Sequence, residues 1–149
     1  MANSYCFVDS LKELMKERGL NINQFSKLIG YDFQAIARWL DGKYYPRHYV
    51  LADLSKFFNH SIDYILGLSD NETFKISENQ SNFLERLNIC LKRDNISRYR
   101  LSKLCNIRQS TISKWFTDGR IPETATLIAL AKLFGCSVEY LLGRVNKPY

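Results

Sequence analysis

The 149-residue sequence contains few of the residues that break secondary structure, with only seven glycines and three prolines. Hydrophobic residues make up 46% of the chain and charged residues 24%, which is typical of a globular protein and excludes collagen-like and disordered chains. No apolar run approaches the roughly 18 residues that a membrane-spanning helix requires, so we expect no transmembrane segment. The opening sequence MANSYCFVDS lacks the basic and apolar regions of a secretion signal, so we expect a cytoplasmic protein.

The sequence also lacks the residue groupings of metal, redox and catalytic sites. Its thiol and imidazole residues are Cys6, Cys90, Cys105, Cys136, His48 and His60. No two cysteines have C-x-x-C spacing, and neither histidine has a convincing nucleophile or carboxylate partner. Cys90 and Cys105 fall where a helical pattern requires an apolar residue, so we expect inert, buried thiols there. With no glycine-rich phosphate loop either, the sequence predicts a protein that is not an enzyme and holds no metal or cofactor.

Positive charge is concentrated in one half of the chain, whose formal net charge is +6. Residues 1–76 hold nine Lys/Arg and nine Asp/Glu, whereas residues 77–149 hold twelve and six. The whole positive excess therefore lies in the second half. A basic half joined to a neutral half is typical of a polyanion-binding module attached to a module that attracts anions less strongly.

The two halves are copies of one another. An offset of 76 residues, without gaps, aligns residues 7–67 with residues 83–143 and gives 17 identical pairs among 61 positions. Each copy is just long enough to bury a small core of its own. We therefore expect one domain over residues 1–68 and a second over residues 83–149, joined by a polar linker over residues 69–82 that can dock locally.

Apolar residues recur at three- and four-residue steps in each copy, and no stretch alternates for long enough to form a strand, which predicts an all-α fold. Gly19 would end the first helix, and Asn21 and Ser97 are N-cap residues that would begin a second helix in each copy. Gly30 and Asn106 tolerate the left-handed backbone at a helix end, and a new helix starts about two residues later. This tight pattern predicts a helix-turn-helix.

The same spacing predicts which residues face the core of each copy. In the second helix they are Phe25, Leu28 and Ile29, matched by Leu101, Leu104 and Cys105. In the third helix they are Ile36 and Trp39, matched by Ile112 and Trp115. The opposite face of the third helix is thereby free for an external partner. A fourth helix and a short fifth helix would complete each copy, the fifth with a Ser N-cap and a Gly stop in SIDYILG and SVEYLLG.

A resemblance to a known family is carried by NIRQSTISKWFTDGRIPETATLIALAKLFGCSVEYLLG, residues 106–143, and in the first copy by IARWLDGKYYP and SIDYILG. These segments resemble the Cro/repressor-type helix-turn-helix family, also called XRE. The resemblance implies two tandem five-helix domains of the lambda-repressor-like helix-turn-helix fold. It further implies a transcriptional regulator, by family habit a repressor, whose third helix enters the major groove of double-stranded DNA.

By position, the resemblance assigns two sets of DNA contacts to the second copy. The base-reading residues would be Gln109, Ser110, Ser113 and Lys114. The phosphate-binding residues would be Arg98, Tyr99, Arg108 and Arg120. The side-chain chemistry agrees, because Gln pairs with adenine, Lys donates to guanine and Ser bonds to either. One departure is Phe116, which, like Leu40 in the first copy, replaces the Glu that the family often has after its tryptophan.

The first copy departs further from this pattern. Three of its residues remove a polar contact, since Ile22, Asp32 and Phe33 replace Arg98, Arg108 and Gln109. The weaker candidates for DNA contact in this copy are Gln34, Arg38 and Lys43. An exposed Phe33 suits a protein contact at least as well as a contact with a thymine methyl group.

Two architectures follow from the duplication. A single chain can dock both copies on an asymmetric site, because a 14-residue linker would reach about 45–50 Å, more than one turn of DNA. Alternatively, the neutral first copy forms a homodimer and two second copies read a palindromic site. The candidate interface residues are Phe33, Tyr44, Tyr45 and Tyr149.

Two functions also remain open. The first is a sequence-specific DNA-binding regulator with no membrane or small-molecule partner. The second is a protein-interaction module of the same fold, antirepressor- or antitoxin-like, with weak DNA binding, which the neutrality of the first copy favours. Salt dependence separates the two, because neutralising about five phosphates predicts a log–log slope of binding against salt near −4.5.

Overall fold

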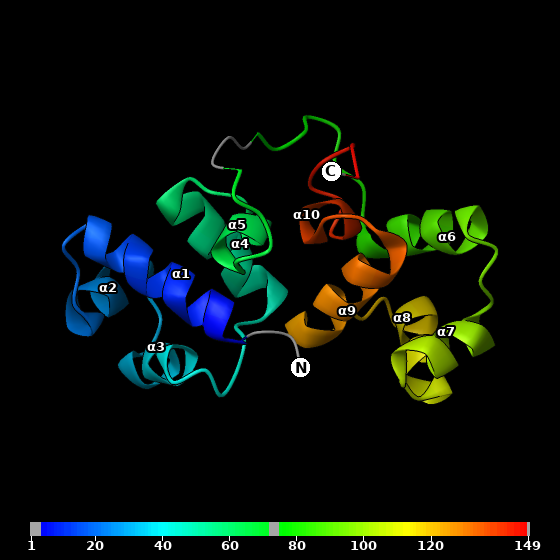
Figure 1. The fold of residues 1–149 in the computed structure, drawn as a ribbon, viewed down its shortest axis with the longest axis horizontal. Helices are drawn as coiled ribbons and strands as arrows, with labels where there is room; N and C mark the ends of the chain where they lie inside the picture. The colour runs from blue at the N-terminus through cyan, green and yellow to red at the C-terminus, as the bar shows by residue number, and fades with distance from the viewer. Residues whose placement is uncertain (1–3, 72–74, 149) are drawn as a thin grey trace. The chain divides into compact units, whose positions relative to one another are not determined.

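The computed structural model describes residues 4–71 and 75–148 of the chain. The chain divides into two compact units, Met1–Phe74 (unit 1) and Lys75–Tyr149 (unit 2). The described residues form ten helices and no strand, with five helices in each unit, which confirms the predicted all-α fold (Figure 1). None of these helices combines the length and the apolar character needed to cross a membrane. Tyr149, one of the predicted interface residues, lies outside the described part of the chain.

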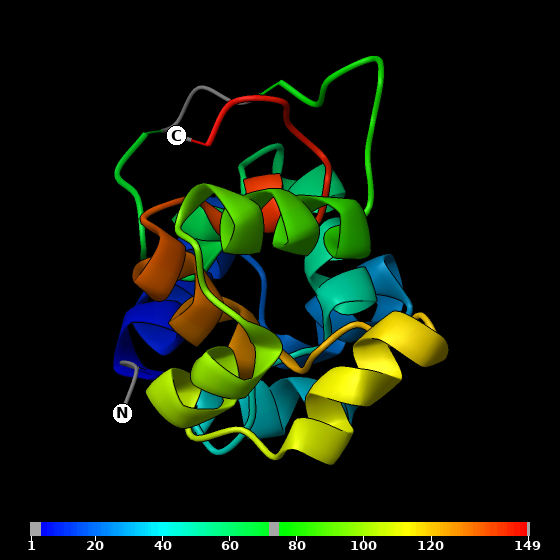
Figure 2. The same ribbon diagram turned by 90° about the vertical axis from the view of Figure 1, so that its right-hand side faces the viewer.

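The helices follow in the same order in both units. Unit 1 contains α1 (Ser4–Glu17), α2 (Ile22–Ile29), α3 (Phe33–Leu40), α4 (His48–Phe58) and α5 (Ile62–Ile65). Unit 2 contains α6 (Phe83–Arg93), α7 (Arg98–Cys105), α8 (Gln109–Thr117), α9 (Thr124–Phe134) and α10 (Val138–Leu141). In each unit a short turn joins the second helix to the third, and Figure 2 shows this turn between α7 (yellow-green) and α8 (yellow).

Side-chain caps explain where the second helix of each unit begins. Asn21 Oδ1 accepts a hydrogen bond from the Gln24 N–H at 2.8 Å, and Gln24 Oε1 accepts one from the Asn21 N–H at 2.9 Å. This reciprocal pair satisfies two backbone donors at the start of α2. In unit 2, Ser97 Oγ accepts a hydrogen bond from the Arg100 N–H at 3.1 Å. Both predicted N-caps are confirmed.

The ends of these helices and the starts of the short fifth helices also agree with the sequence. Gly30 follows α2 with a φ of 81°, and Asn106 follows α7 with a φ of 52°. Both residues therefore adopt the left-handed backbone that ends a helix. Ser61 Oγ and Ser137 Oγ each accept a hydrogen bond from the N–H three residues later, at 2.9 and 3.0 Å. The Ser N-caps of α5 and α10 are thereby confirmed.

A serine hydroxyl fixes the turn of each helix-turn-helix. In unit 1, Ser26 Oγ donates to the Tyr31 carbonyl oxygen at 2.6 Å. In unit 2, Ser102 Oγ donates to the Ile107 carbonyl oxygen at 2.5 Å. Each bond joins the middle of the second helix to a residue within the turn, so it restricts the angle at which the third helix begins.

The prediction that Leu28 and Leu104 face the core is wrong, because these side chains are 62% and 48% exposed. The buried apolar residues of their helices are Phe25 and Leu101, both 0% exposed. Ser26 follows Phe25 and Ser102 follows Leu101 in the sequence. Because each serine bonds to a carbonyl of the turn, it occupies the second inward position of its helix. Since successive residues of a helix are about 100° apart, a buried face centred on these two positions leaves the leucine beyond its edge.

The third helices pack as predicted. Ile36 and Ile112 are 0% and 1% exposed, and Trp39 and Trp115 are 6% and 2% exposed. The rings of Phe83 and Trp115 meet edge to face with their centroids 5.7 Å apart, so α8 is held against α6. Further buried residues complete the two cores, among them Phe7, Leu11, Leu51, Leu54, Phe58, Leu87, Leu127, Leu130 and Phe134.

Part of the segment predicted as a linker, residues 69–82, is docked on unit 2. The Ser77 N–H donates to the Arg144 carbonyl oxygen and the Ser81 N–H donates to the Gly143 carbonyl oxygen, both at 2.9 Å. These bonds satisfy two backbone carbonyl groups of the segment that follows α10. Residues 77–81 therefore pack on unit 2.

Candidate nucleic-acid interface

The third helix of unit 2 presents four polar side chains on its exposed face. With Ile112 and Trp115 buried, the residues that turn outward are those predicted to read bases, Gln109, Ser110, Ser113 and Lys114, and all four are exposed. They span the first two turns of α8, whose outer face carries donors and acceptors of the types that recognise base edges in a major groove. The structure thus brings this predicted set together on one surface.

The N-terminus of α8 is open to an anion. Arg108 occupies the N-cap position and makes no side-chain capping bond, in contrast to the serine that caps α7. The first backbone N–H groups of a helix carry partial positive charge, so an uncapped start favours a phosphate oxygen. Arg108 itself is exposed and adds a full positive charge at this point.

Arg98, a predicted phosphate ligand, lies against an aromatic ring of the neighbouring helix. Its guanidinium carbon is 3.5 Å from the centroid of the Phe116 ring, so the first residue of α7 is stacked on the second half of α8. Stacking leaves the N–H groups at the edge of the guanidinium free to donate in its plane. The sequence did not predict this pairing, although the presence of Arg98 and Phe116 in the same copy is the signal from which it could have been found.

Two further basic residues of α7 extend this surface. Tyr99 is 58% exposed, and Lys103 Nζ lies 5.4 Å from the centroid of its ring. Arg100 and Lys103 are both exposed. Sequence reasoning missed Arg100 and Lys103 because it followed the family positions. The four-residue spacing of Tyr99 and Lys103 on one helix already places those two side chains next to each other.

Arg120 lies in the turn that follows α8 and has a competing partner. Its Nε is 3.7 Å from Asp118 Oδ2, and the two side chains are 64% and 49% exposed. Ion pairs at this degree of exposure contribute little to stability, so a phosphate can replace Asp118 as the partner of Arg120. Unit 2 as a whole carries thirteen Lys/Arg against six Asp/Glu.

The corresponding helix of unit 1 has a different surface. Phe33 begins α3 and is 42% exposed, and Asp32 occupies the N-cap position that Arg108 has in unit 2. The predicted weaker DNA candidates Gln34, Arg38 and Lys43 are all exposed. With its N-cap residue included, this helix therefore offers one cation fewer and one more exposed apolar side chain to a partner than α8 does.

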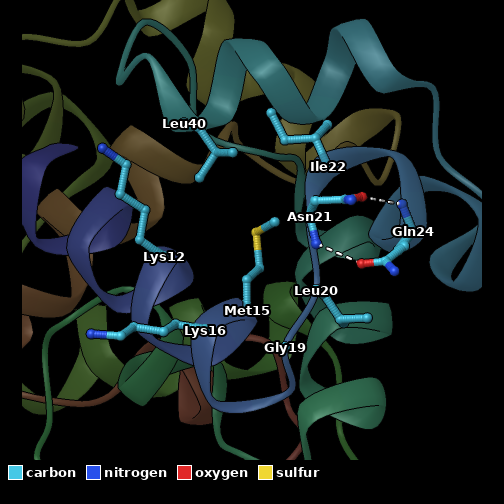
Figure 3. Close-up of a pocket in the computed structure, with 9 residues that line it drawn as sticks. All are labelled: Lys12, Met15, Lys16, Gly19, Leu20, Asn21, Ile22, Gln24 and Leu40. Carbon is cyan, nitrogen blue, oxygen red and sulfur yellow. Dashed lines mark hydrogen bonds between the residues drawn. The ribbon is translucent and has the colours of Figure 1, made fainter.

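Unit 1 has a shallow cavity next to the residues that replace the stacked pair of unit 2. Ile22 and Leu40 occupy the positions of Arg98 and Phe116, and the cavity beside them has a volume of about 550 Å³ (Figure 3). It is lined by Lys12, Met15, Lys16, Gly19, Leu20, Asn21, Ile22, Gln24 and Leu40. Lys12 and Lys16 are the cations that α1 places here, and sequence reasoning missed both.

Tyr31, His48 and Cys105 have perturbed pKa values with clear causes. Burial and a hydrogen bond to Asp53 raise the pKa of Tyr31 to about 12, so its hydroxyl stays protonated and donates to that carboxylate. Burial, with a smaller contribution from Arg47, lowers the pKa of His48, which favours the neutral imidazole. Burial raises the pKa of the Cys105 thiol.

Cys90 and Cys136 lie together in unit 2. Cys90 is fully buried in α6, as the sequence predicts, and its side chain is hydrogen-bonded to that of Cys136, which lowers the pKa of Cys90. Cys105 is partly buried. Among the residues that the structure describes, no group of three or more His, Cys, Asp or Glu side chains is placed to hold a metal ion.

Comparison with known proteins gives a family for this arrangement. A family model described as helix-turn-helix matches residues 11–65 and, a second time, residues 88–141. The chain belongs to this helix-turn-helix family. The XRE-type resemblance and the two tandem helical domains are therefore confirmed. Each match spans the first to the fifth helix of its unit and includes the turn between the second and third helices.

One relative is a transcriptional regulator by name. The chain is 33% identical over 76 residues to the HTH-type transcriptional activator BcrR of Enterococcus faecalis. The aligned part is 51% of this chain and 37% of that protein, so the similarity covers little more than a third of the relative. No solved structure matches the chain.

Proposed function

We propose that this helix-turn-helix protein is a sequence-specific DNA-binding transcriptional regulator that reads the major groove with α8. The observation that carries the proposal is the outer face of α8, where Gln109, Ser110, Ser113 and Lys114 are exposed opposite a buried Ile112 and Trp115. The uncapped start of the helix and the stacked Arg98 flank this face with phosphate donors.

In this proposal unit 1 is the weaker DNA reader. Its third helix supplies Gln34 and Arg38 where α8 supplies Ser110 and Lys114, but it has Asp32 and Phe33 at its start. The negative charge of Asp32 opposes a phosphate at the point where Arg108 attracts one. Unit 1 therefore adds affinity and extends the recognised sequence, while the main discrimination between bases comes from unit 2.

The experiment is selection of binding sites from a random duplex pool by the full chain, followed by affinity measurements on the enriched site at a series of salt concentrations. We expect an enriched motif and a log–log slope near −4.5 for about five phosphate contacts. Failure to enrich any sequence, together with loss of retention near physiological salt, would contradict the proposal.

A matched pair of double variants tests the division of labour. Gln109→Ala with Lys114→Ala removes two base-reading side chains from α8, and Gln34→Ala with Arg38→Ala removes two from α3. We expect the α8 variant to abolish selective binding and the α3 variant to weaken it. Lys132→Ala, which removes an exposed cation from α9, is the control for loss of charge alone. Equal losses from α3 and α8 would contradict the assignment of the main reader to unit 2.

A second function, binding of a protein partner, is favoured by the exposed apolar side chains of unit 1. Leu28, Tyr44 and Tyr49 are 62%, 63% and 56% exposed, and Phe33 is 42% exposed. Phe33→Ser separates the two functions. If Phe33 contacts a protein partner, this variant should bind that partner more weakly, and the salt dependence of its DNA binding should not change. A promoter reporter in the presence and absence of the protein measures whether DNA binding represses, as the family habit suggests, or activates.

A further inference from the structure

Two cysteines of unit 2 are in contact although they lie far apart in the sequence. Cys90 belongs to α6 and Cys136 lies between α9 and α10, and a hydrogen bond joins their side chains. Both are free thiols, Cys90 fully buried and Cys136 partly buried. The sequence predicts an inert thiol at Cys90, whereas the structure gives that thiol a second sulfur with which it can react.

The backbone around the two cysteines is held in place. The Cys136 N–H donates to the Ala131 carbonyl oxygen at 3.0 Å, which fixes Cys136 to the end of α9. Arg93, one turn after Cys90 on α6, donates from Nη2 to the Phe134 carbonyl oxygen at 2.6 Å. The end of α9 is therefore tied to α6 next to the two cysteines, which keeps the two sulfurs within reach of each other.

A second cation of α6, Arg86, lies one turn before Cys90. Arg86 is 8% exposed, and it donates from Nη2 to the Val145 carbonyl oxygen at 3.2 Å and to Asn146 Oδ1 at 3.0 Å. These acceptors fix the guanidinium in the interior of unit 2. Because charges interact more strongly inside a protein than in water, a buried cation at this distance favours a negative charge on the Cys90 sulfur.

The surroundings of Cys90 favour its thiolate. The hydrogen bond with Cys136 lowers the pKa of Cys90 most, and Arg93 and Arg86 lower it further, against the opposing effects of burial and of Asp94. The thiolate is the form of cysteine that attacks peroxides and other sulfur atoms. The contact and the two arginines thus supply both the geometry and the charge that disulfide formation requires.

Two comparisons within the chain single out this pair of cysteines. Cys105 is also partly buried, but burial raises the pKa of its thiol and so disfavours the reactive form. In unit 1 the positions that match Cys90 and Cys136 hold Leu14 and His60. A modification that needs both thiols is therefore confined to unit 2.

We propose that Cys90 and Cys136 form a redox modification site, at which a hydroperoxide converts the two thiols into a reversible disulfide. Helices α7 and α8, the helix-turn-helix of unit 2, lie within the loop of residues 91–135 that this bond closes. Closing a loop lowers the conformational entropy of the unfolded chain, so oxidation stabilises unit 2. The proposal goes beyond DNA binding and does not depend on the proposed function.

The reaction consumes one hydroperoxide in two steps. The Cys136 sulfur, the more exposed of the two, attacks a peroxide oxygen as a thiolate, so that an S–O bond forms, the O–O bond breaks and the leaving oxygen takes up a proton. The Cys90 thiolate then attacks the sulfur of this sulfenic acid, so that the S–S bond forms, the S–O bond breaks and hydroxide leaves as water with a second proton. The two sulfurs lose two electrons, which the peroxide gains.

The test uses a full chain in which Cys6→Ser and Cys105→Ser leave Cys90 and Cys136 as the remaining cysteines, and we call it the pair-only chain. It is treated with equimolar hydrogen peroxide and its intact mass is measured. We expect a loss of about 2 Da, for two hydrogen atoms, and loss of reactivity with iodoacetamide at both thiols. Dithiothreitol should reverse both changes. Peptide mapping of the unaltered protein after the same treatment should show the same bond and a free Cys105.

Cys136→Ser in the pair-only chain is the matched control. This variant retains the buried Cys90 thiol and both arginines of α6 but removes the second sulfur. It should keep its mass under the same treatment, because Cys90 then has no thiol with which to form a bond.

The stabilising effect is measured on each unit through its own tryptophan, since the chain has two. In the pair-only chain, Trp39→Phe leaves Trp115 to report the unfolding of unit 2, and Trp115→Phe leaves Trp39 to report that of unit 1. Oxidation should raise the urea midpoint of unit 2 by at least about 1 M and leave that of unit 1 unchanged.

Several results would overturn this inference. They are oxidation that stops at a mass gain of about 16 or 32 Da, disulfide-linked dimers, a bond that involves Cys105 in the unaltered protein, and a loss of mass by the Cys136→Ser control. An unchanged urea midpoint of unit 2 after complete oxidation would overturn its stabilising role. If a variant fails to fold, the peptide map of the unaltered protein decides. None of these results bears on DNA binding, so the proposed function stands or falls separately.

Discussion

Replacing Phe116 by leucine should weaken DNA binding without changing its dependence on salt. The ring of Phe116 holds the guanidinium of Arg98 at 3.5 Å from its centroid, and unit 1 has leucine at the matching position. Phe116→Leu removes the aromatic face but leaves the charge of Arg98 in place. The number of cations near DNA is therefore constant, and only the position of one of them changes.

The magnitude follows from the exposure of the pair. A cation–π contact at an exposed site contributes about 0.5–1 kcal/mol, and Arg98 is exposed. If the whole contribution goes into positioning Arg98 against a phosphate, affinity falls by about fivefold at most. Arg98→Ala should lower affinity further and should also reduce the log–log salt slope by about 0.9, because one phosphate contact is lost.

Fluorescence anisotropy of the selected duplex, measured over a series of potassium chloride concentrations, gives both quantities for each variant. Phe57→Leu is the matched control, because Arg18 lies 5.0 Å from the centroid of the Phe57 ring, and neither residue belongs to unit 2. A decrease in salt slope for Phe116→Leu as large as that for Arg98→Ala would refute the reasoning, as would an effect of Phe57→Leu of equal size.

Three further predictions concern the fold. Ser97→Ala should lower the free energy of unfolding by about 1 kcal/mol, because the Arg100 N–H loses its acceptor, and thermal denaturation compared with that of the unaltered protein measures it. Leu101→Ala should cost about 2–5 kcal/mol, whereas Leu104→Ala should change stability by less than about 0.5 kcal/mol; similar losses in urea denaturation would contradict the burial assigned to α7. The pKa of Tyr31 is raised to about 12, so the hydrogen bond to Asp53 should stabilise the protein fully below the ordinary tyrosine pKa near 10 and be lost as pH rises from 10 to 12. Tyr31→Phe should remove that part of the pH dependence, and tyrosinate absorbance that rises with a single pKa near 10 would contradict it.

The fold was predictable because its signals are local. Asn21, Ser97, Gly30 and Asn106 are residues whose capping roles depend on a few neighbouring backbone groups, and the structure gives each of them the expected geometry. Because the second copy repeats the first at an offset of 76 residues, each assignment in one copy was supported by the matching residue in the other. Burial of a third-helix tryptophan in both units follows in the same way from its spacing to the isoleucine three residues before it.

The features that the sequence did not predict depend on contacts between distant residues or on two side chains that compete for one inward position of a helix. Leu28 and Leu104 fit a helical pattern, but a serine hydroxyl that bonds across the turn takes the inward position, and periodicity alone does not weigh that bond. Local docking of the polar segment was expected from the sequence, but the partners of residues 77–81 were not, because they lie more than 60 residues later. The outward direction of the α8 side chains followed from the sequence, whereas the stacking of Arg98 on Phe116 did not.

The buried Arg86 also affects the order in which the two units complete their folding during synthesis. Its guanidinium packs 4.4 Å from the centroid of the Tyr140 ring and bonds to residues 145 and 146, so unit 2 has a buried cation whose acceptors are translated after all five of its helices. A buried charge without its acceptors is strongly destabilising. On a ribosome, unit 1 can therefore fold while unit 2 is still incomplete, and unit 2 reaches its native packing only after residues 145 and 146 emerge from the exit tunnel.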